Sequence, residues 1–240
     1  MNSNQDAATA ATTPVRAMPL GDSITRGLII PPPGMVPGGY RAPLYQRLTR
    51  EWGPVVFVGS ANDNPDPDRL PCPNHEGHGG FRIDEIAAGI ELWLDRAGPD
   101  VILLHIGTND MAQGFDLARA PARLRDLIEK IAGRSPKAYL LVAQIISSTD
   151  AETQHRIERY NAAIPGIVDT MRAAGHDVLT VNMFDVVPAN GFADPYHPNA
   201  LGYARIADAW FDAIRLLPVD ALTTLKSRSD STTPSRRPPV

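Results

Sequence analysis

Short apolar runs alternate along this chain with segments whose apolar residues recur every three or four positions, and this alternation constrains the fold more than any other feature. A parallel sheet covered by helices on both faces produces such a pattern. The apolar runs predict five strands, at residues 15–20, 55–59, 101–106, 139–145 and 178–184. The segments of helical period predict helices at residues 40–52, 83–97, 117–131, 157–171 and 199–217. We therefore expect a three-layer α/β/α fold with a flavodoxin-like, five-stranded parallel sheet.

Two prolines lie inside predicted helices, with different expected consequences. Pro121 is near the start of its helix, where the missing N–H of proline removes no helical hydrogen bond. Pro165 lies in the middle of the helix predicted at residues 157–171, so we expect a kink or a break there.

The composition is that of an ordinary globular domain. Of the 240 residues, 43% are hydrophobic and 21% are charged, which allows a substantial core. The formal net charge is −4 and no stripe of Lys or Arg occurs, so neither a nucleic acid nor an anionic membrane is an expected partner. No apolar run approaches the roughly 18 residues of a membrane-spanning helix. Cys72 is the single cysteine, which excludes a disulfide within the chain.

The two ends of the sequence differ in composition from its middle. Residues 1–14 lack the basic start and the apolar stretch of a secretory signal, which predicts a flexible tail and, for the chain as given, a cytoplasmic protein. Had a signal been removed, we would expect a secreted protein. Residues 218–240 are rich in Pro, Ser and Arg, which predicts a second flexible tail. Residues 15–217 are then expected to form one domain.

Four short stretches rich in glycine or polar residues follow predicted strands. Ser23 comes after the first strand, in MPLGDSITRG, and GHGG at residues 77–80 lies in the loop after the second. GTND at residues 107–110 follows the third strand, and DPYHPN at residues 194–199 lies between the last strand and the last helix. In open parallel sheets, ligands bind outside the carboxyl ends of the strands, where these loops emerge. We therefore expect the four stretches to meet at one edge of the sheet.

These stretches hold the residue types that ester hydrolysis needs. A serine hydroxyl becomes nucleophilic when a neighbouring base takes its proton, and His197 can be that base for Ser23. Asp194, three residues earlier, can fold back to orient the imidazole. The oxyanion formed by attack on an ester needs donors that are aimed at it in advance. The available donors are the backbone N–H groups of Ser23 and Gly80 and the side-chain amide of Asn109.

The blocks GDSIT, GHGGFRID, GTND and DPYHPN resemble, in order and spacing, those of the SGNH hydrolases, the GDSL-type esterase superfamily. This resemblance covers most of the predicted domain. It implies that Ser23 is the nucleophile, that Asp194 and His197 complete a catalytic triad, and that Gly80 and Asn109 join Ser23 in the oxyanion hole. The longer pattern GDSIT, GGYRAPLY, FVGS, HEGHGGFRIDEI and HIGTND looks like the branch that includes acetylxylan esterases, which act on carbohydrate acetates.

The same residues have purely structural interpretations. Ser23 could cap a helix, and Asn109 or its neighbour Asp110 could cap the next one. Gly80 could serve only to adopt a positive φ angle, and the block DPYHPN could be a simple surface turn. The occurrence of all four blocks at one sheet edge favours catalysis.

Two loop segments have features of metal sites. Cys72, His75 and His78 have spacings that zinc could use, although a fourth ligand is not evident. The acidic segment at residues 62–68 could hold calcium, although it lacks a spaced bidentate Glu. We expect neither a metal nor another cofactor. We expect His105, inside an apolar strand, to be a packed core residue.

The sequence thus predicts a metal-independent serine esterase that works through an acyl-enzyme on Ser23 and takes a small-molecule or carbohydrate ester. The loop at residues 61–80 is mostly polar, which suits short acyl groups, above all acetyl, and polar alcohols. The loop at residues 28–39 carries apolar residues that could instead form a lid for longer chains. The alternatives are a broad aryl-esterase, lysophospholipase or thioesterase of the same superfamily, and a carbohydrate-binding protein without turnover.

Overall fold

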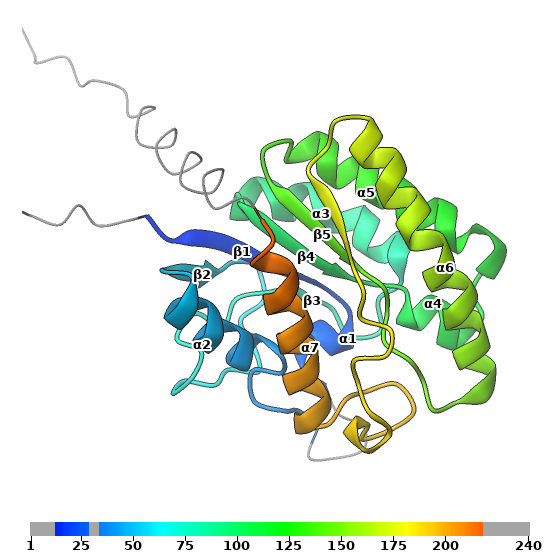
Figure 1. The fold of residues 1–240 in the computed structure, drawn as a ribbon, viewed down its shortest axis with the longest axis horizontal. Helices are drawn as coiled ribbons and strands as arrows, with labels where there is room; N and C mark the ends of the chain where they lie inside the picture. The colour runs from blue at the N-terminus through cyan, green and yellow to red at the C-terminus, as the bar shows by residue number, and fades with distance from the viewer. Residues whose placement is uncertain (1–12, 29–33, 218–240) are drawn as a thin grey trace, which may run out of the picture.

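The computed structural model describes residues 13–28 and 34–217. Its centre is a sheet with strand order β2-β1-β4-β5-β6 and one further short strand, β3, paired to β1 (Figure 1). The strands are β1 (Val15–Gly21), β2 (Val55–Phe57), β3 (Glu76–Gly77), β4 (Val101–His105), β5 (Tyr139–Ala143) and β6 (Val178–Val181). All the strand pairings are parallel. The order of the main strands is the flavodoxin-like order, so the predicted fold class is confirmed.

Helices cover both faces of the sheet (Figure 1). On one face lie α2 (Arg41–Glu51) and α7 (Ala200–Ile214), and on the other lie α3 (Ile83–Ala97), α5 (Ala120–Arg134) and α6 (Ala151–Ala173). The short helices α1 (Ser23–Arg26) and α4 (Thr108–Gln113) follow β1 and β4 directly, and the 3₁₀ turns are η1 (Leu117–Arg119) and η2 (Ala189–Gly191).

The alternation of side chains along each strand divides the core into two layers. In β4, Ile102 and Leu104 pack in the layer of α3, α5 and α6, whereas Val101 and Leu103 pack in the layer of α2 and α7. Every residue of β4 and β5 is buried. A parallel strand between two helical layers has no solvent face, which explains why these strands are continuous apolar runs in the sequence.

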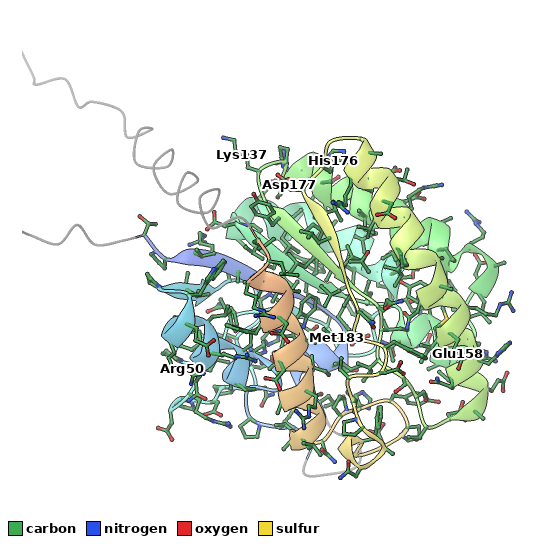
Figure 2. All side chains as sticks on the ribbon, in the orientation of Figure 1. Arg50, Lys137, Glu158, His176, Asp177 and Met183 are labelled. Atoms are coloured by element: carbon green, nitrogen blue, oxygen red, sulfur yellow. The ribbon has the colours of Figure 1, made fainter. Side chains whose placement is uncertain are left out.

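Most charged side chains lie on the outside of this sandwich. In Figure 2, Arg50, Lys137 and Glu158 extend from the surface, whereas Met183, which follows β6, is fully buried in the layer of α2 and α7. Within the described residues, no helix has both the length and the apolar character that a membrane span requires.

The strand β3 departs from the five-strand prediction. The loop after β2 was expected to be irregular, but Glu76 and Gly77 pair with Leu20 and Gly21 of β1. Since β2 ends at Phe57 and pairs with only the first half of β1, it leaves the second half of this edge open. The two residues of β3 occupy that open part, so the loop that carries Gly80 starts directly beside the end of β1.

Of the kink or break expected at Pro165, the break is wrong, because α6 runs without interruption from 151 to 173. Proline has no N–H for the Asn161 carbonyl one turn earlier, and this carbonyl instead accepts a hydrogen bond from Gln144 Nε2 at 3.2 Å. The helix also begins earlier than predicted, because Asp150 caps it by accepting from Thr153 N at 2.9 Å.

The predicted tails lie largely outside the described residues, because the structure does not describe residues 1–12 and 218–240. Residues 29–33, part of the predicted lid loop, also lie outside them. The limits of the predicted domain therefore stay a prediction.

Candidate active site

Ser23 is the first residue of α1, at the turn where β1 ends. Gly21 passes the His105 carbonyl group so closely that a Cβ at Gly21 would collide with its oxygen. Asp22 Oδ1 accepts a hydrogen bond from Ile24 N at 2.9 Å and so caps α1. Asp22 therefore performs the capping that was the structural interpretation of Ser23, and the Ser23 hydroxyl makes a different contact.

That contact is part of a hydrogen-bonded chain of three side chains. Ser23 Oγ lies 2.8 Å from His197 Nε2, and His197 Nδ1 lies 2.9 Å from Asp194 Oδ2 and 3.0 Å from Oδ1. Ser23 is 5% exposed and His197 is 8% exposed, so the hydrogen bond between them is largely shielded from water. A carboxylate at Nδ1 favours the tautomer with its proton on Nδ1, which leaves the Nε2 lone pair to accept from the serine hydroxyl. This arrangement can move a proton from Ser23 to His197.

The loop that carries His197 is held from two directions. Asp194 Oδ1 accepts from the backbone N–H of His197 at 2.9 Å, which closes a tight turn. The Pro195 carbonyl oxygen accepts from Ser148 Oγ at 2.8 Å and from Thr149 N at 3.2 Å. Ser148 and Thr149 follow β5 and were not identified from the sequence, because their role depends on a contact between distant loops.

Asn109 and Gly80, the other expected donors, lie on adjoining segments. Asn109 Nδ2 donates to the Phe81 carbonyl oxygen at 2.9 Å, which ties the loop after β3 to α4. Gly80 is exposed and has a φ of 82°, in the left-handed region. The positive φ expected as its structural interpretation is therefore observed. Gly107, rather than Asn109, is at the N-cap position of α4.

Asp110 connects α4 to two neighbouring helices. Its Oδ2 accepts from Ile83 N at 3.1 Å, at the start of α3, and its Oδ1 accepts from Arg123 of α5 at 2.7 Å. Asp110 was expected as a possible cap of its own helix, α4, but it instead accepts a hydrogen bond from the first turn of α3. Burial raises the pKa of Asp110, and the Arg123 guanidinium opposes this rise.

Two buried titratable groups lie close to Ser23. Burial raises the pKa of Asp22 to about 7 and lowers the pKa of His105 to about 4. His105 is 1% exposed, and its Nε2 accepts from Ile146 N at 3.4 Å. The prediction that His105 is a core residue is therefore confirmed, and this histidine is uncharged at neutral pH.

The two histidines of the candidate metal segments contact neighbouring side chains or the backbone. His75 Nε2 lies 3.0 Å from Asp63 Oδ1, and its Nδ1 accepts from Gly77 N at 2.9 Å. His78 Nε2 lies 2.9 Å from Glu76 Oε2. Across residues 13–28 and 34–217, no group of three or more His, Cys, Asp or Glu side chains is placed to hold a metal ion.

Arg41 of α2 joins the loops around Ser23 and was missed from the sequence. Its guanidinium is fully buried and donates to the carbonyl oxygens of Pro73 and, at 3.4 Å, of Arg26 and Asn64. Burial lowers the pKa of Arg41 to about 10, so it stays charged at neutral pH. Because its partners are backbone carbonyls, no residue pattern in the sequence indicated this role.

The family model of the GDSL-like Lipase/Acylhydrolase family matches residues 20–205. Among curated proteins, the chain is 28% identical over 231 residues to a "Multidomain esterase" of Ruminococcus flavefaciens, covering 85% of this chain and 29% of that protein. It is 32% identical over 153 residues to a "Putative endoglucanase X" of Acetivibrio thermocellus, covering 62% of this chain and 63% of that protein. The chain therefore spans less than two thirds of the length of either relative.

Solved structures of two carbohydrate esterases and of an acetyl esterase are similar over most of the chain. The "Clostridium thermocellum family 3 carbohydrate esterase" is 34% identical with a TM-score of 0.71, covering 89% of this chain and 100% of that one. A family 3 carbohydrate esterase from Talaromyces cellulolyticus is 27% identical with a TM-score of 0.69, covering 86% and 98%. The S10A mutant of an acetyl esterase, solved with an acetate ion, is 25% identical with a TM-score of 0.68, covering 86% and 98%.

Proposed function

The chain belongs to the GDSL-like lipase/acylhydrolase family, a family of carboxylic ester hydrolases, and we propose that it hydrolyses acetyl esters of carbohydrates through an acyl-enzyme on Ser23. The resemblance to the carbohydrate-esterase branch that the sequence indicated is confirmed by the similarity to family 3 carbohydrate esterases. The family gives the reaction class, and the residues around Ser23 support the mechanism.

The observation that carries the proposal is the hydrogen-bonded chain from Asp194 through His197 to Ser23. Ser23 Oγ attacks the ester carbonyl carbon while His197 Nε2 takes its proton. The imidazolium, stabilised by Asp194, then donates this proton to the departing alcohol oxygen, and the acyl group stays on Ser23. Water then attacks the acyl carbonyl carbon while His197 takes a proton from the water. His197 donates this proton to Ser23 Oγ as the carboxylic acid leaves, which restores the serine hydroxyl.

Each attack places a negative charge on the former carbonyl oxygen. The backbone N–H groups of Ser23 and Gly80 and the side chain of Asn109 are the proposed donors to this oxyanion. A side-chain amide has two N–H groups, so Asn109 can donate to Phe81 through one and to the oxyanion through the other. The bond to Phe81 also fixes the amide in one orientation before substrate arrives.

The proposed preference for acetyl groups and sugar alcohols rests on the loop after β2 and on the relatives. This loop consists mainly of polar and small residues, and a pocket for long acyl chains needs a continuous apolar lining. Two similar solved structures are named as family 3 carbohydrate esterases and one as an acetyl esterase.

A substrate panel tests this function. Acetylated xylan, acetylated monosaccharides and aryl esters of graded acyl length would be incubated with the protein, and the Ser23→Ala variant would give the background rate. We expect acetate release from the carbohydrate esters that the variant does not support. Activity confined to long-chain esters would favour a lipolytic enzyme, and carbohydrate binding without release of any acid would favour a binding protein.

A further inference from the structure

The Gly80 N–H belongs to a residue of the loop after β3 that has little packing around it. Gly80 is exposed, has a φ of 82°, and has no atom within 4 Å of the place where a Cβ would be. An oxyanion donor must already be in place when the substrate reacts. The position of this N–H must therefore be set by the residues on either side of it.

The backbone on both sides of Gly80 is anchored through His78. The His78 N–H donates to the Gly21 carbonyl oxygen at 2.9 Å, and the Phe81 N–H donates to the His78 carbonyl oxygen at 3.1 Å. Gly77 packs directly on the backbone of Thr25 in α1, the helix that Ser23 begins, and Figure 1 shows β3 beside this helix. The turn from His78 to Phe81 is thus built against the end of β1 and against α1.

The His78 side chain holds the same turn from outside. Its imidazole is stacked between two aromatic rings, with the Phe81 centroid at 4.9 Å and the Trp93 centroid at 4.4 Å, and with interplanar angles of 22° and 17°. Its Nε2 is 2.9 Å from Glu76 Oε2, and the Glu76 carboxylate, 1% exposed, also accepts from Ser60 Oγ at 3.0 Å. The ring thereby connects the far end of the turn to α3.

The Trp93 ring of this stack packs against its own helix. Trp93 lies on α3, and a Cβ on Gly89, one turn earlier, would collide with its indole ring. The backbone of α3 at Gly89 therefore packs closely against the indole ring on which His78 stacks.

We propose that His78 is a positioning residue that holds the Gly80 N–H in place for the oxyanion, through the stack of its imidazole between Phe81 and Trp93. The proposal rests on the proposed function, in which the Gly80 N–H is a donor to that oxyanion. His78 touches neither the serine nor the reacting carbonyl in this account. The proposed effect of His78 is confined to the two attack steps, in which negative charge develops on the carbonyl oxygen, so we expect it to alter kcat rather than KM.

Three substitutions separate the contributions of the ring and of the hydrogen bond. His78→Ala removes both, His78→Gln keeps a donor for Glu76 without the ring, and His78→Phe keeps a ring between Phe81 and Trp93 without the donor. With p-nitrophenyl acetate, we expect kcat to fall at least roughly tenfold in the Ala and Gln variants, with KM within about threefold of the wild-type value. His78→Phe should retain kcat within about threefold. His155→Ala is the matched control, because its side chain is 72% exposed on α6, and it should have wild-type kinetics.

A second measurement needs no substrate. Backbone ¹⁵N relaxation should show greater fast motion of the Gly79 and Gly80 amides in His78→Ala and His78→Gln than in His78→Phe or the wild type. Thermal unfolding of each variant shows whether it is folded, and the Gln and Phe variants keep the test decisive if the Ala variant is not.

The proposal is overturned by a wild-type kcat in folded His78→Gln, by a loss confined to KM, by a His78→Phe variant as impaired as His78→Gln, or by unchanged Gly80 motion. Failure of the proposed function is a different result. In that case Ser23→Ala would keep full activity, whereas failure of the positioning role alone leaves Ser23→Ala inactive beside an active His78→Gln.

Discussion

Ser23 Oγ and His197 Nε2 lie 2.8 Å apart, although 174 positions separate the two residues in the sequence. Ser23 follows β1, and His197 lies in the segment after β6, with β4 and β5 between those strands in the sheet. The segment between β6 and α7 must therefore reach back over the carboxyl ends of the intervening strands. The contact of Pro195 with Ser148 and Thr149, which follow β5, supports this segment on its way.

Asp194 has an observed role in the turn and a proposed role in catalysis, and substitutions can separate the two. Asp194→Asn keeps an oxygen for the backbone N–H groups of the turn but loses the carboxylate that stabilises the imidazolium, so we expect kcat to fall by roughly a hundredfold or more at a nearly unchanged Tm. Asp194→Ala loses the turn acceptor as well and should also lower Tm by a few degrees. Ester kinetics and thermal unfolding would measure these effects, with Asp169→Asn, exposed on α6, as the control. An Asn variant within threefold of the wild-type kcat would contradict this role for Asp194.

Asn109→Ala should lower kcat by roughly a hundredfold or more with a smaller change in KM, because the proposed oxyanion donor would bind the oxyanion better than the ground-state carbonyl oxygen. Steady-state kinetics with p-nitrophenyl acetate would give both constants, and Asn182→Ala, an exposed asparagine after β6, is the control. A change in KM alone would make Asn109 a residue that positions the substrate.

The layered fold could be predicted from the sequence because its strands are buried on both faces. Residues of β4 and β5 face one helical layer or the other and never water, so they form continuous apolar runs that periodicity detects. The strand β3 gave no such signal, since Glu76 and Gly77 are two residues without an apolar pattern. The expectation of a break at Pro165 was wrong because the sequence alone does not reveal the hydrogen bond from Gln144 that satisfies the Asn161 carbonyl.

The candidate site was predictable to the extent that it follows strand ends. Ser23, Asn109 and His197 come after strands whose carboxyl ends meet at one sheet edge, and the structure brings Ser23 and His197 into contact there. The supporting contacts were not predictable. Arg41 binds backbone carbonyls of distant loops, and the His78 ring stacks on side chains that only the folded chain places beside it.

Asp22 should make stability depend on pH in a defined direction. Its pKa is about 7 in the folded protein and 3.8 as the ordinary value, so between these limits the unfolded chain gives up a proton that the folded protein keeps. The stability that Asp22 contributes is therefore present at low pH and is lost as pH rises through this range. Asp22→Asn removes this dependence and still caps α1 through its side-chain oxygen.

We therefore expect the Tm of Asp22→Asn minus the wild-type Tm to increase by several degrees between pH 5 and pH 8. Thermal unfolding of both proteins across this range measures the difference. His105, whose pKa is lowered to about 4, has the opposite pH dependence, but it is present in both proteins and cancels in the comparison. A Tm difference that is constant or that decreases with pH would contradict a protonated, buried Asp22.

The acyl-chain preference can be measured along a series of p-nitrophenyl esters. We expect kcat/KM to fall steeply from acetyl through butyryl to octanoyl, because a polar loop cannot give each added methylene the roughly 0.8 kcal/mol of burial that a fitted apolar pocket provides. A rise toward octanoyl would favour the lipolytic alternative and would leave the Ser23 mechanism unaffected.

The most direct test of the central claim is kcat/KM of Ser23→Ala for p-nitrophenyl acetate, measured beside Ser135→Ala. Ser135 is the C-cap residue of α5 and lies just before the amino end of β5, so it serves as the matched serine control. We expect the Ser23 variant to lose at least roughly a thousandfold while keeping the wild-type Tm, and the Ser135 variant to match the wild type. A folded Ser23→Ala protein that keeps a tenth of the wild-type kcat/KM would contradict the assignment of Ser23 as the nucleophile.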